Sequence, residues 1–194
     1  DEEGKETGEV MTADEGIRHE TSAEKMAALP PAHFEPALAP DITAGNSSQM
    51  NDAAAGMLIC SRETAEKLGL RPRAAFRHFA VGADSATWVL TAPNPVTRKL
   101  YEKTGLTTAD FDAIEVNEAF ASITMAWERE FKPDPALLNP RGGAIAIGHP
   151  LGASGIRLMT TMLHYLEDTG GRLGFQTMCE GGGQANATVI ERLG

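Results

Sequence analysis

The chain has 194 residues and a hydrophobic fraction of 42%, which is typical of a globular protein with a core of ordinary size. Its net charge of −10 argues against a surface that binds nucleic acid. No apolar run is long enough to span a bilayer and no signal-like segment opens the chain, so we expect a cytoplasmic protein without a membrane partner.

Irregular sequence fills the first forty residues. The chain begins with Asp1, shows no hydrophobic periodicity in this part, and carries four prolines within residues 26–40. Because proline and the residue before it disfavour helix, we expect residues 26–40 to run extended across a surface. We also expect the chain to be a piece of something longer.

Regular elements follow from residue 53 onward. Apolar spacing and glycine stops predict, in chain order, a strand (Ala53–Cys60), a helix (Arg62–Leu68), a strand (Ala74–Val81), a helix (Pro95–Lys103), a strand (Asp112–Asn117), two helices (Glu118–Phe131 and one that contains Ile156–Leu166) and two strands (Arg172–Met178 and Ala185–Glu191). The order β-α-β-α-β-α-α-β-β predicts an α/β domain in which helices pack on a mixed sheet.

Glycine crowds the stretch Gly142–Gly155, which contains a single histidine, His149. Glycine lets the main chain approach a ligand closely, Pro150 fixes the chain after the histidine, and Ser154 is placed to cap the next helix. A histidine held rigidly beside bare backbone N–H groups suits a site where negative charge develops on an oxygen.

The two cysteines stand in different settings. Cys60 ends an apolar run and is expected to be a small buried hydrophobe, whereas Cys179 opens a second glycine-rich loop, Cys179–Gln184. Their spacing matches no zinc site, so we expect no metal, and a disulfide is not expected either. One histidine and one cysteine on glycine-rich loops indicate acyl transfer.

Four segments together resemble the signature of the thiolase family, whose enzymes cleave 3-ketoacyl-CoA or run the reverse Claisen condensation. They are Thr43–Ala55, Asn117–Ala121, Gly142–Gly155 and Cys179–Gly183. The resemblance implies a thiolase-like fold in which residues 1–40 are the trailing segment of the loop domain and residues 41–194 are the C-terminal domain. It implies thiolytic cleavage of 3-ketoacyl-CoA in fatty-acid or steroid catabolism.

Two departures from the common family pattern make the chain similar to degradative thiolases of actinobacterial lipid and steroid catabolism. Glu180 follows the last cysteine, and Ser47-Ser48-Gln49 replaces the commoner Ala-Ser-Gly. No residue matches the family's acylated cysteine, which lies in its N-terminal domain. We therefore expect either part of a longer polypeptide or one subunit of a split enzyme.

The resemblance also implies roles for three residues. His149 activates the missing cysteine and donates a hydrogen bond to the enolate oxygen; the alternative is a core histidine satisfied by backbone. Cys179 is the second catalytic sulfur, with a pKa lowered by loop N–H groups and His149, unless it is structural. Glu180 would oppose that ionisation, so it is expected to face away. Gly181 offers a backbone N–H to the other oxyanion.

Two further residues complete the implied site. Asn117 holds a water in the enolate hole, caps the helix Glu118–Phe131, or does both. Ser48 either hydrogen-bonds the pantetheine arm or is a turn residue.

Coenzyme A and acyl-CoA are expected as substrates rather than as tightly bound cofactors. The expected partners are the N-terminal thiolase half and further copies of the chain, in a homodimer or homotetramer.

Two other classes of function stay open at this point. A non-catalytic acyl-CoA-binding subunit would need neither His149 nor Cys179, so the presence of both argues against it. A condensing enzyme of the ketoacyl synthase type typically carries a second histidine or an asparagine in place of Cys179, which argues against that class.

Overall fold

The computed structural model describes residues 4–10, 12–14, 16–32, 41–85 and 87–194. Four strands form one sheet in the order β1-β4-β3-β2, namely β1 (Ala74–Ala83), β4 (Gln184–Arg192), β3 (Leu173–Glu180) and β2 (Ala113–Val116). Strands β2 and β3 are parallel and the other two pairs are antiparallel. The predicted mixed sheet of an α/β fold is therefore confirmed.

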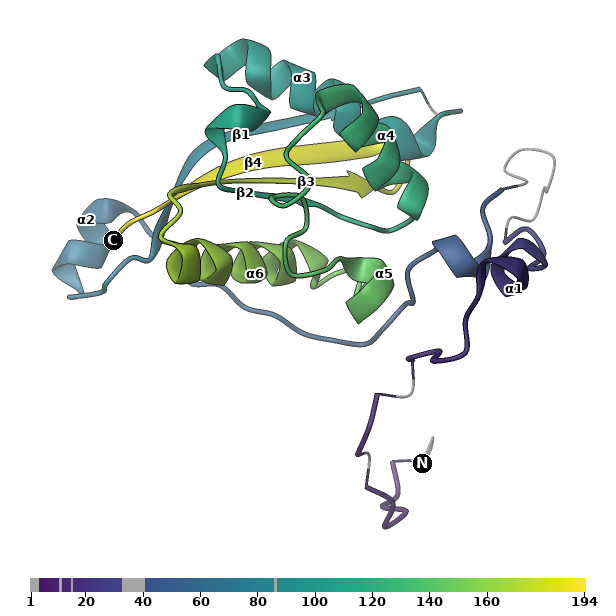
Figure 1. The fold of residues 1–194 in the computed structure, drawn as a ribbon. Coiled ribbons are helices and arrows are strands. Elements are labelled where there is room, and N and C mark those ends of the chain that lie inside the picture. Colours follow the sequence, from purple (N-terminus) through teal and green to yellow (C-terminus); the bar gives the residue numbers. More distant parts are fainter. Residues whose placement is uncertain (1–3, 11, 15, 33–40, 86) are drawn as a thin grey trace.

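Helices cover both faces of this sheet (Figure 1). The helices of the described residues are α1 (Ala23–Ala27), α2 (Arg62–Lys67), α3 (Pro93–Thr104), α4 (Ala121–Phe131), α5 (Ala144–Ile147) and α6 (Ser154–Thr169), with 3-10 turns η1 (Ala44–Asn46), η2 (Val89–Thr91) and η3 (Thr108–Asp110). Helices α3 and α4 lie on one face and α6 on the other.

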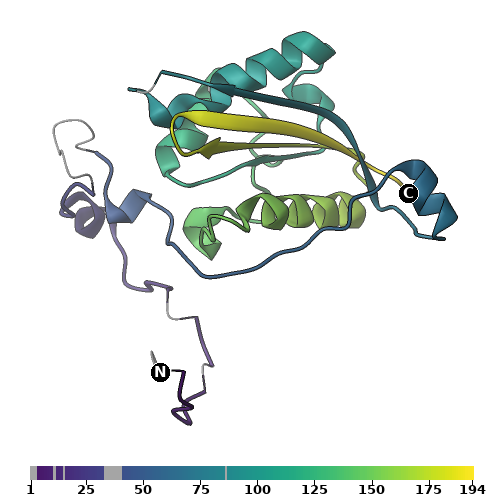
Figure 2. The same ribbon diagram turned by 180° about the vertical axis from the view of Figure 1, so that it is seen from behind.

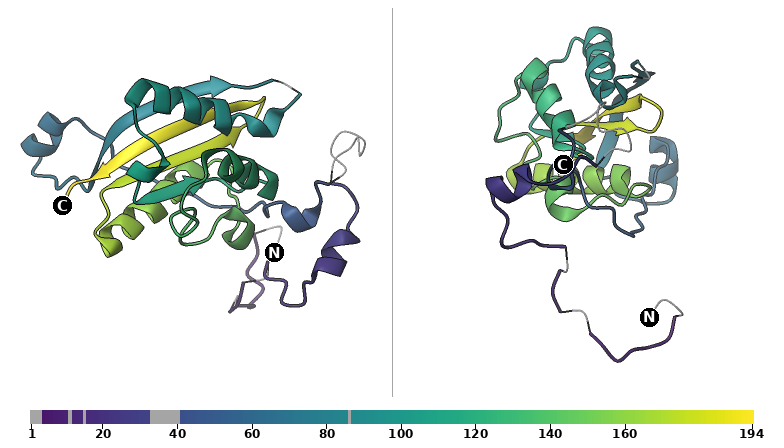
Figure 3. Two further views of the ribbon diagram at one scale, coloured as in Figure 1. Left: turned by 45° about the horizontal axis from the view of Figure 1, so that its top comes forward. Right: turned by 90° about the vertical axis from the view of Figure 1, so that its right-hand side faces the viewer.

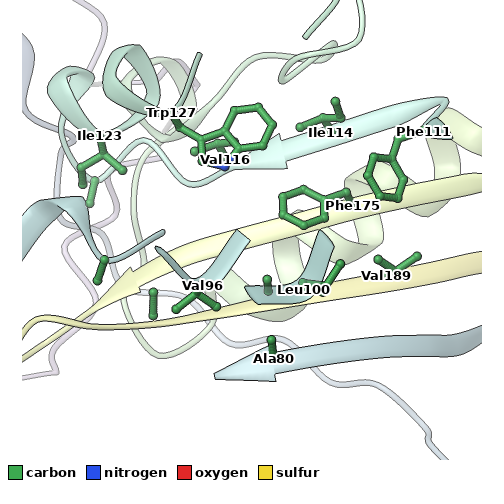
Figure 4. Close-up of a cluster of buried hydrophobic side chains, with 14 residues drawn as sticks. Ala80, Val96, Leu100, Phe111, Ile114, Val116, Ile123, Trp127, Phe175 and Val189 are labelled. Carbon is green, nitrogen blue, oxygen red and sulfur yellow. The ribbon is translucent and has the colours of Figure 1, made fainter. Parts of the chain in front are cut away.

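An aromatic core fills the space between the sheet and the pair α3 and α4 (Figure 4). Trp127 of α4 stacks on Phe175 of β3, and its indole N–H donates to the hydroxyl of Thr97 (2.9 Å). Ile123 is buried one turn before Trp127. The apolar spacing that predicted this helix is thus confirmed, because residues with that spacing share one side of the helix, and this side packs on the sheet.

A second core, rich in methionine, lies between the sheet and α6. Met159, Met162, Leu163 and Leu166 pack against strands β2 and β4. The helix ends at Gly170, whose φ of 75° is left-handed and so favours glycine. The predicted face and end of this helix are confirmed.

The strand predicted over Ala53–Cys60 is wrong. This segment is extended but pairs with no strand in the described part of the chain, and it passes along the outer side of α6 (Figure 2). Leu58 and Ile59 are 79% and 63% exposed, and Cys60, expected to be buried, is exposed as well. An apolar run becomes a strand only beside a partner strand, and here Met57 alone contacts the α6 core.

The N-terminal part lies away from the sheet and its helices (Figure 3). Its short helix α1 begins after Ser22, whose hydroxyl accepts a hydrogen bond from the backbone N–H of Lys25 (3.2 Å). Because α1 extends to Ala27, the extended run predicted for residues 26–40 is wrong at its start. Residues 33–40 lie outside the described residues.

Within the ranges that the structure describes, no helix combines the length and the apolar character needed to cross a membrane.

Candidate active site

The backbone of His149 is held by one segment that is distant in sequence. Its side chain and backbone are 7% exposed, and its N–H donates to the carbonyl of Gln49 (2.7 Å) and to Oδ1 of Asn51 (3.1 Å). The preceding Gly148 has a φ of 90°, and a Cβ there would lie 2.0 Å from Oδ1 of Asn51. Glycine is therefore required for the segment 49–51 to cross the histidine so closely.

The imidazole of His149 is fixed in one tautomer by Ser154. Nδ1 lies 2.6 Å from the Ser154 hydroxyl, which donates its own hydrogen to the carbonyl of Pro150 (3.0 Å). The serine oxygen therefore accepts Nδ1–H, and the lone pair of Nε2 stays available. The predicted cap at Ser154 is wrong, since Ala153 precedes the helix and the hydroxyl is engaged by His149.

Electrostatics favour the neutral form of this imidazole. Burial lowers the pKa of His149, and the positive charge of Arg157 on α6 lowers it further. A neutral imidazole with its lone pair on Nε2 can accept a proton, which is the requirement for a general base.

Asn117 is brought next to that nitrogen. It is fully buried at the end of β2, its N–H donates to the carbonyl of Thr177 (3.0 Å), and its Nδ2 lies 3.4 Å from Nε2 of His149. Helix α4 starts later, at Ala121, after Phe120. The alternative in which Asn117 caps that helix is therefore excluded.

A half-buried carboxylate supports the loop that leads to His149. Glu118 accepts hydrogen bonds from the N–H of Ile145 at the start of α5 and from Nδ2 of Asn139, both at 3.2 Å. A Cβ on Gly143 would lie only 2.1 Å from the Glu118 carboxyl carbon. The loop thus needs glycine at this position because the carboxylate occupies the space.

Ser48 lies on the segment that crosses the site. Both its N–H and its hydroxyl donate to the carbonyl of Ala119, each at 3.0 Å, and the residue is half-buried. Its only hydroxyl hydrogen is therefore used within the chain. The oxygen lone pairs remain to accept a hydrogen bond from a ligand N–H.

The pKa of the Cys179 thiol differs from the expectation. It is half-buried near the end of β3, where burial and the nearby charge of Glu180 raise the pKa of its thiol to about 11. The predicted lowered pKa is wrong for this chain, because desolvation disfavours the thiolate. No hydrogen bond between described residues joins Cys179 to His149. Glu180 does face away, accepting a hydrogen bond from Nδ2 of Asn186 (2.6 Å).

Gly181 lies in the exposed turn between β3 and β4, and the space around it is open. The next two residues, Gly182 and Gly183, have φ values of 78° and 76°, so this turn depends on glycine. Around these loops, as elsewhere among the described residues, no group of three or more His, Cys, Asp or Glu side chains could hold a metal ion.

Sequence reasoning missed the residues that support this site. They are Asn51, Glu118, Asn139 and Arg157, together with Ser154 in its contact with His149, since the sequence predicted only a helix cap there. Only Glu118 carried a local signal, as a carboxylate between a strand end and a helix. The others act through contacts that the fold creates.

Comparison with known proteins identifies the family that shares this fold and this histidine-bearing glycine loop. The family model for the C-terminal domain of thiolase matches residues 70–192, and the model for the N-terminal domain of thiolase matches residues 1–63. The chain therefore belongs to the thiolase family. The domain boundary predicted after residue 40 stays a prediction.

Individual relatives agree with this assignment. The chain is 53% identical to a steroid 3-ketoacyl-CoA thiolase of Mycobacterium tuberculosis over 93% of this chain and 43% of the relative. It is 46% identical to a beta-ketoadipyl-CoA thiolase of Pseudomonas putida over 95% of this chain and 46% of the relative. The chain thus spans less than half the length of these curated relatives.

Solved structures show the same fold. Human mitochondrial 3-ketoacyl-CoA thiolase in complex with CoA superposes with a TM-score of 0.83 at 35% identity, covering 96% of this chain and 47% of that one. The acetyl-CoA acetyltransferase of Bacillus anthracis gives a TM-score of 0.82 at 35% identity, covering 93% and 45%.

Proposed function

We propose that this chain supplies the histidine side of a thiolase active site, which cleaves 3-ketoacyl-CoA into acetyl-CoA and a shortened acyl-CoA. One observation carries the proposal: the buried imidazole of His149 is held in one tautomer by Ser154, with Nε2 beside the amide of Asn117. The names of the thiolase relatives support the same reaction.

In the first half of the reaction, a nucleophilic cysteine outside this chain attacks the 3-keto carbon. Nε2 of His149 takes the thiol proton, and the bond between carbons 2 and 3 then breaks. Its electron pair passes to the acetyl-CoA fragment as an enolate, while the acyl group stays on the sulfur. The imidazolium N–H and a water held by Asn117 stabilise the enolate oxygen.

In the second half, Cys179 moves the protons. Its high pKa keeps the thiol protonated near neutral pH, so it can protonate the enolate carbon and release acetyl-CoA. The resulting thiolate takes the proton of an incoming CoA, whose sulfur attacks the acyl-enzyme. The cysteine sulfur that leaves recovers its proton from His149, and the backbone N–H of Gly181 stabilises the tetrahedral oxyanion.

Coenzyme A and its esters act as substrates in this proposal. The lone pairs of the Ser48 hydroxyl accept a hydrogen bond from an amide N–H of the pantetheine arm, since the hydroxyl hydrogen is donated to the carbonyl of Ala119.

An N-terminal thiolase half, on the same polypeptide, supplies the nucleophilic cysteine. The relative at 53% identity favours a steroid-derived substrate. A cytoplasmic location and assembly into a homodimer or homotetramer stay predictions.

The Cys179→Ala variant of the complete enzyme tests the division of roles. We expect thiolysis of acetoacetyl-CoA to fall by about a thousandfold, because general acid–base transfer contributes on the order of 10²–10⁴ in rate. Acetoacetyl-CoA should still acylate the nucleophilic cysteine, because the attack on its 3-keto carbon uses His149 and precedes the proton transfers of Cys179. Mass spectrometry of the intact protein would detect the trapped acetyl group.

The exposed Cys60 provides the matched control. Cys60→Ala should keep the normal rate of thiolysis and should not accumulate the acyl-enzyme. Loss of acylation together with turnover in Cys179→Ala would show that Cys179 is structural, and absence of thiolysis by the unmodified enzyme would overturn the proposed function.

A further inference from the structure

Polar atoms without partners gather next to the pair of His149 and Asn117. Nine buried side-chain nitrogen and oxygen atoms of the described residues have no hydrogen-bond partner, and seven of them belong to Glu115, Asn117, Arg157 and Gln176. Buried polar atoms in folded proteins are almost always paired. Their concentration in one place therefore calls for a shared explanation.

Two neighbouring strands and one helix bring these side chains together. Glu115 of β2 lies directly opposite Gln176 of β3, and Asn117 follows on the same face of the sheet. Nε2 of Gln176 donates to the carbonyl of Gly155 (3.2 Å), which places this face against the first turn of α6. Arg157 lies in that same turn.

The donors and acceptors of the cluster complement each other. Every unpartnered donor atom in it belongs to the guanidinium of Arg157, and the unpartnered acceptors are oxygens of Glu115, Asn117 and Gln176. A small rotation of these side chains or a bridging water joins the two sets. Arg157 is then the shared donor that fixes the amide of Asn117 with its nitrogen toward His149.

We propose that Arg157, supported by Glu115, is a positioning residue that places a positive charge behind His149 and orients the amide of Asn117. The proposal rests on the proposed function only for the use of His149 as a base. Arg157 acts through these neighbours and is not assigned any contact with the substrate.

The charges around His149 are consistent with this role. Arg157 of α6 is the charged group that acts on His149, and Arg157 interacts in turn with Glu115 of β2 and with Glu118, while residues 49–51 carry no charged side chain. Burial raises the pKa of Glu115 to about 8, against the opposing pull of Arg157. The positive charge of Arg157 opposes a second positive charge on His149.

The Arg157→Met variant of the complete enzyme tests this role by removing the charge and keeping an apolar stem. We expect the titration midpoint of His149 to rise by about half a pH unit or more, because an opposing positive charge is lost. NMR of isotope-labelled histidine would measure the midpoint directly, with the signal assigned by its loss in His149→Asn. The acidic limb of the pH profile of kcat/KM should move upward equally.

Three variants separate this role from a structural one. Arg157→Lys keeps the charge and should leave the midpoint in place, and Arg98→Met removes an equal charge from α3, on the opposite face of the sheet, without a shift. Arg157→Gln replaces Arg157→Met if the latter does not fold. An unchanged midpoint in Arg157→Met or Arg157→Gln, or an equal shift in Arg98→Met, would overturn the proposal.

Glu115→Gln tests the charge balance. Because this variant leaves the guanidinium of Arg157 in place, it should shift the midpoint far less than Arg157→Met. A shift as large as that of Arg157→Met would show that Glu115 sets the midpoint as much as Arg157 does, and would overturn the assignment to Arg157. The NMR midpoint needs no turnover, so a shift without thiolysis would count against the proposed function alone.

Discussion

At the residue scale, the arrangement around His149 shows how a hydrogen bond selects a chemical role. Ser154 takes Nδ1–H and leaves Nε2 as the basic atom, facing Asn117. The sequence predicted His149 and Asn117 as site residues, and the fold brings them together. The role of Ser154 could not be predicted, because a serine before a helix is usually a cap.

His149→Asn in the complete enzyme should lower kcat by about a thousandfold or more. The imidazole serves as general base and as oxyanion donor, and each contribution is worth roughly two to three orders of magnitude, although they do not add. KM should change much less, because the histidine acts as charge develops. Steady-state kinetics of acetoacetyl-CoA thiolysis, with folding checked by circular dichroism, would measure both constants.

His164→Asn is the matched control for that variant. His164 is exposed on α6, where it contacts Arg73 and the carbonyl of Thr160, so the variant should keep normal kinetics. A His149→Asn enzyme within about tenfold of the normal kcat would show that the imidazole is not the base.

At the element scale, periodicity predicted most of the fold. Helices α3, α4 and α6 each have one apolar side, which packs on one face of the sheet. The apolar spacing within each helix is therefore enough to predict it from the local sequence. The segment Ala53–Cys60 has the composition of a strand, but strand formation depends on a partner that the local pattern does not encode. The short helix α5 was missed because four residues are too few to show a period.

Gly143→Ala should weaken both the α5 loop and catalysis. The added methyl group would overlap the carboxylate of Glu118, which holds the loop through the N–H of Ile145. We expect a loss of about 1–3 kcal/mol in the free energy of unfolding, typical of an overpacked site, and a lower kcat because His149 follows in the same loop. Chemical denaturation and kinetics of the complete enzyme would measure these effects.

Gly152→Ala tests whether the effect is specific to that contact. No atom of the described chain lies within 4 Å of a Cβ at Gly152, and its φ is not left-handed. This variant should change neither stability nor kcat. Equal effects of the two substitutions would contradict a specific role for the Glu118 contact.

At the scale of the whole molecule, the sequence predicted which loops form the site better than it predicted their electrostatics. Glycine-rich motifs pointed to His149, Cys179 and Gly181 as candidate residues. The high pKa of the Cys179 thiol could not be predicted, because it depends on burial by parts of the fold that are distant in sequence. The same holds for Arg157, whose effect on His149 arises only after α6 packs on β2.

The described surface also carries apolar side chains that a folded domain usually covers. Leu58 and Ile59 in the extended segment, and Phe79 and Val81 on the edge strand β1, are more than half exposed. Exposed apolar groups of this kind mark interaction surfaces. The proposed N-terminal thiolase half is the partner that we expect to cover Leu58 and Ile59.

The chain of residues 1–194 alone should therefore not cleave acetoacetyl-CoA in the presence of CoA. Of its two cysteines, Cys60 matches no nucleophile motif and Cys179 is held protonated, so no thiolate is available to attack the 3-keto carbon. Adding the N-terminal half should restore turnover and slow amide hydrogen exchange in Ala53–Cys60, because a strand partner protects backbone N–H groups. Robust turnover by the purified chain would show that it carries its own nucleophile.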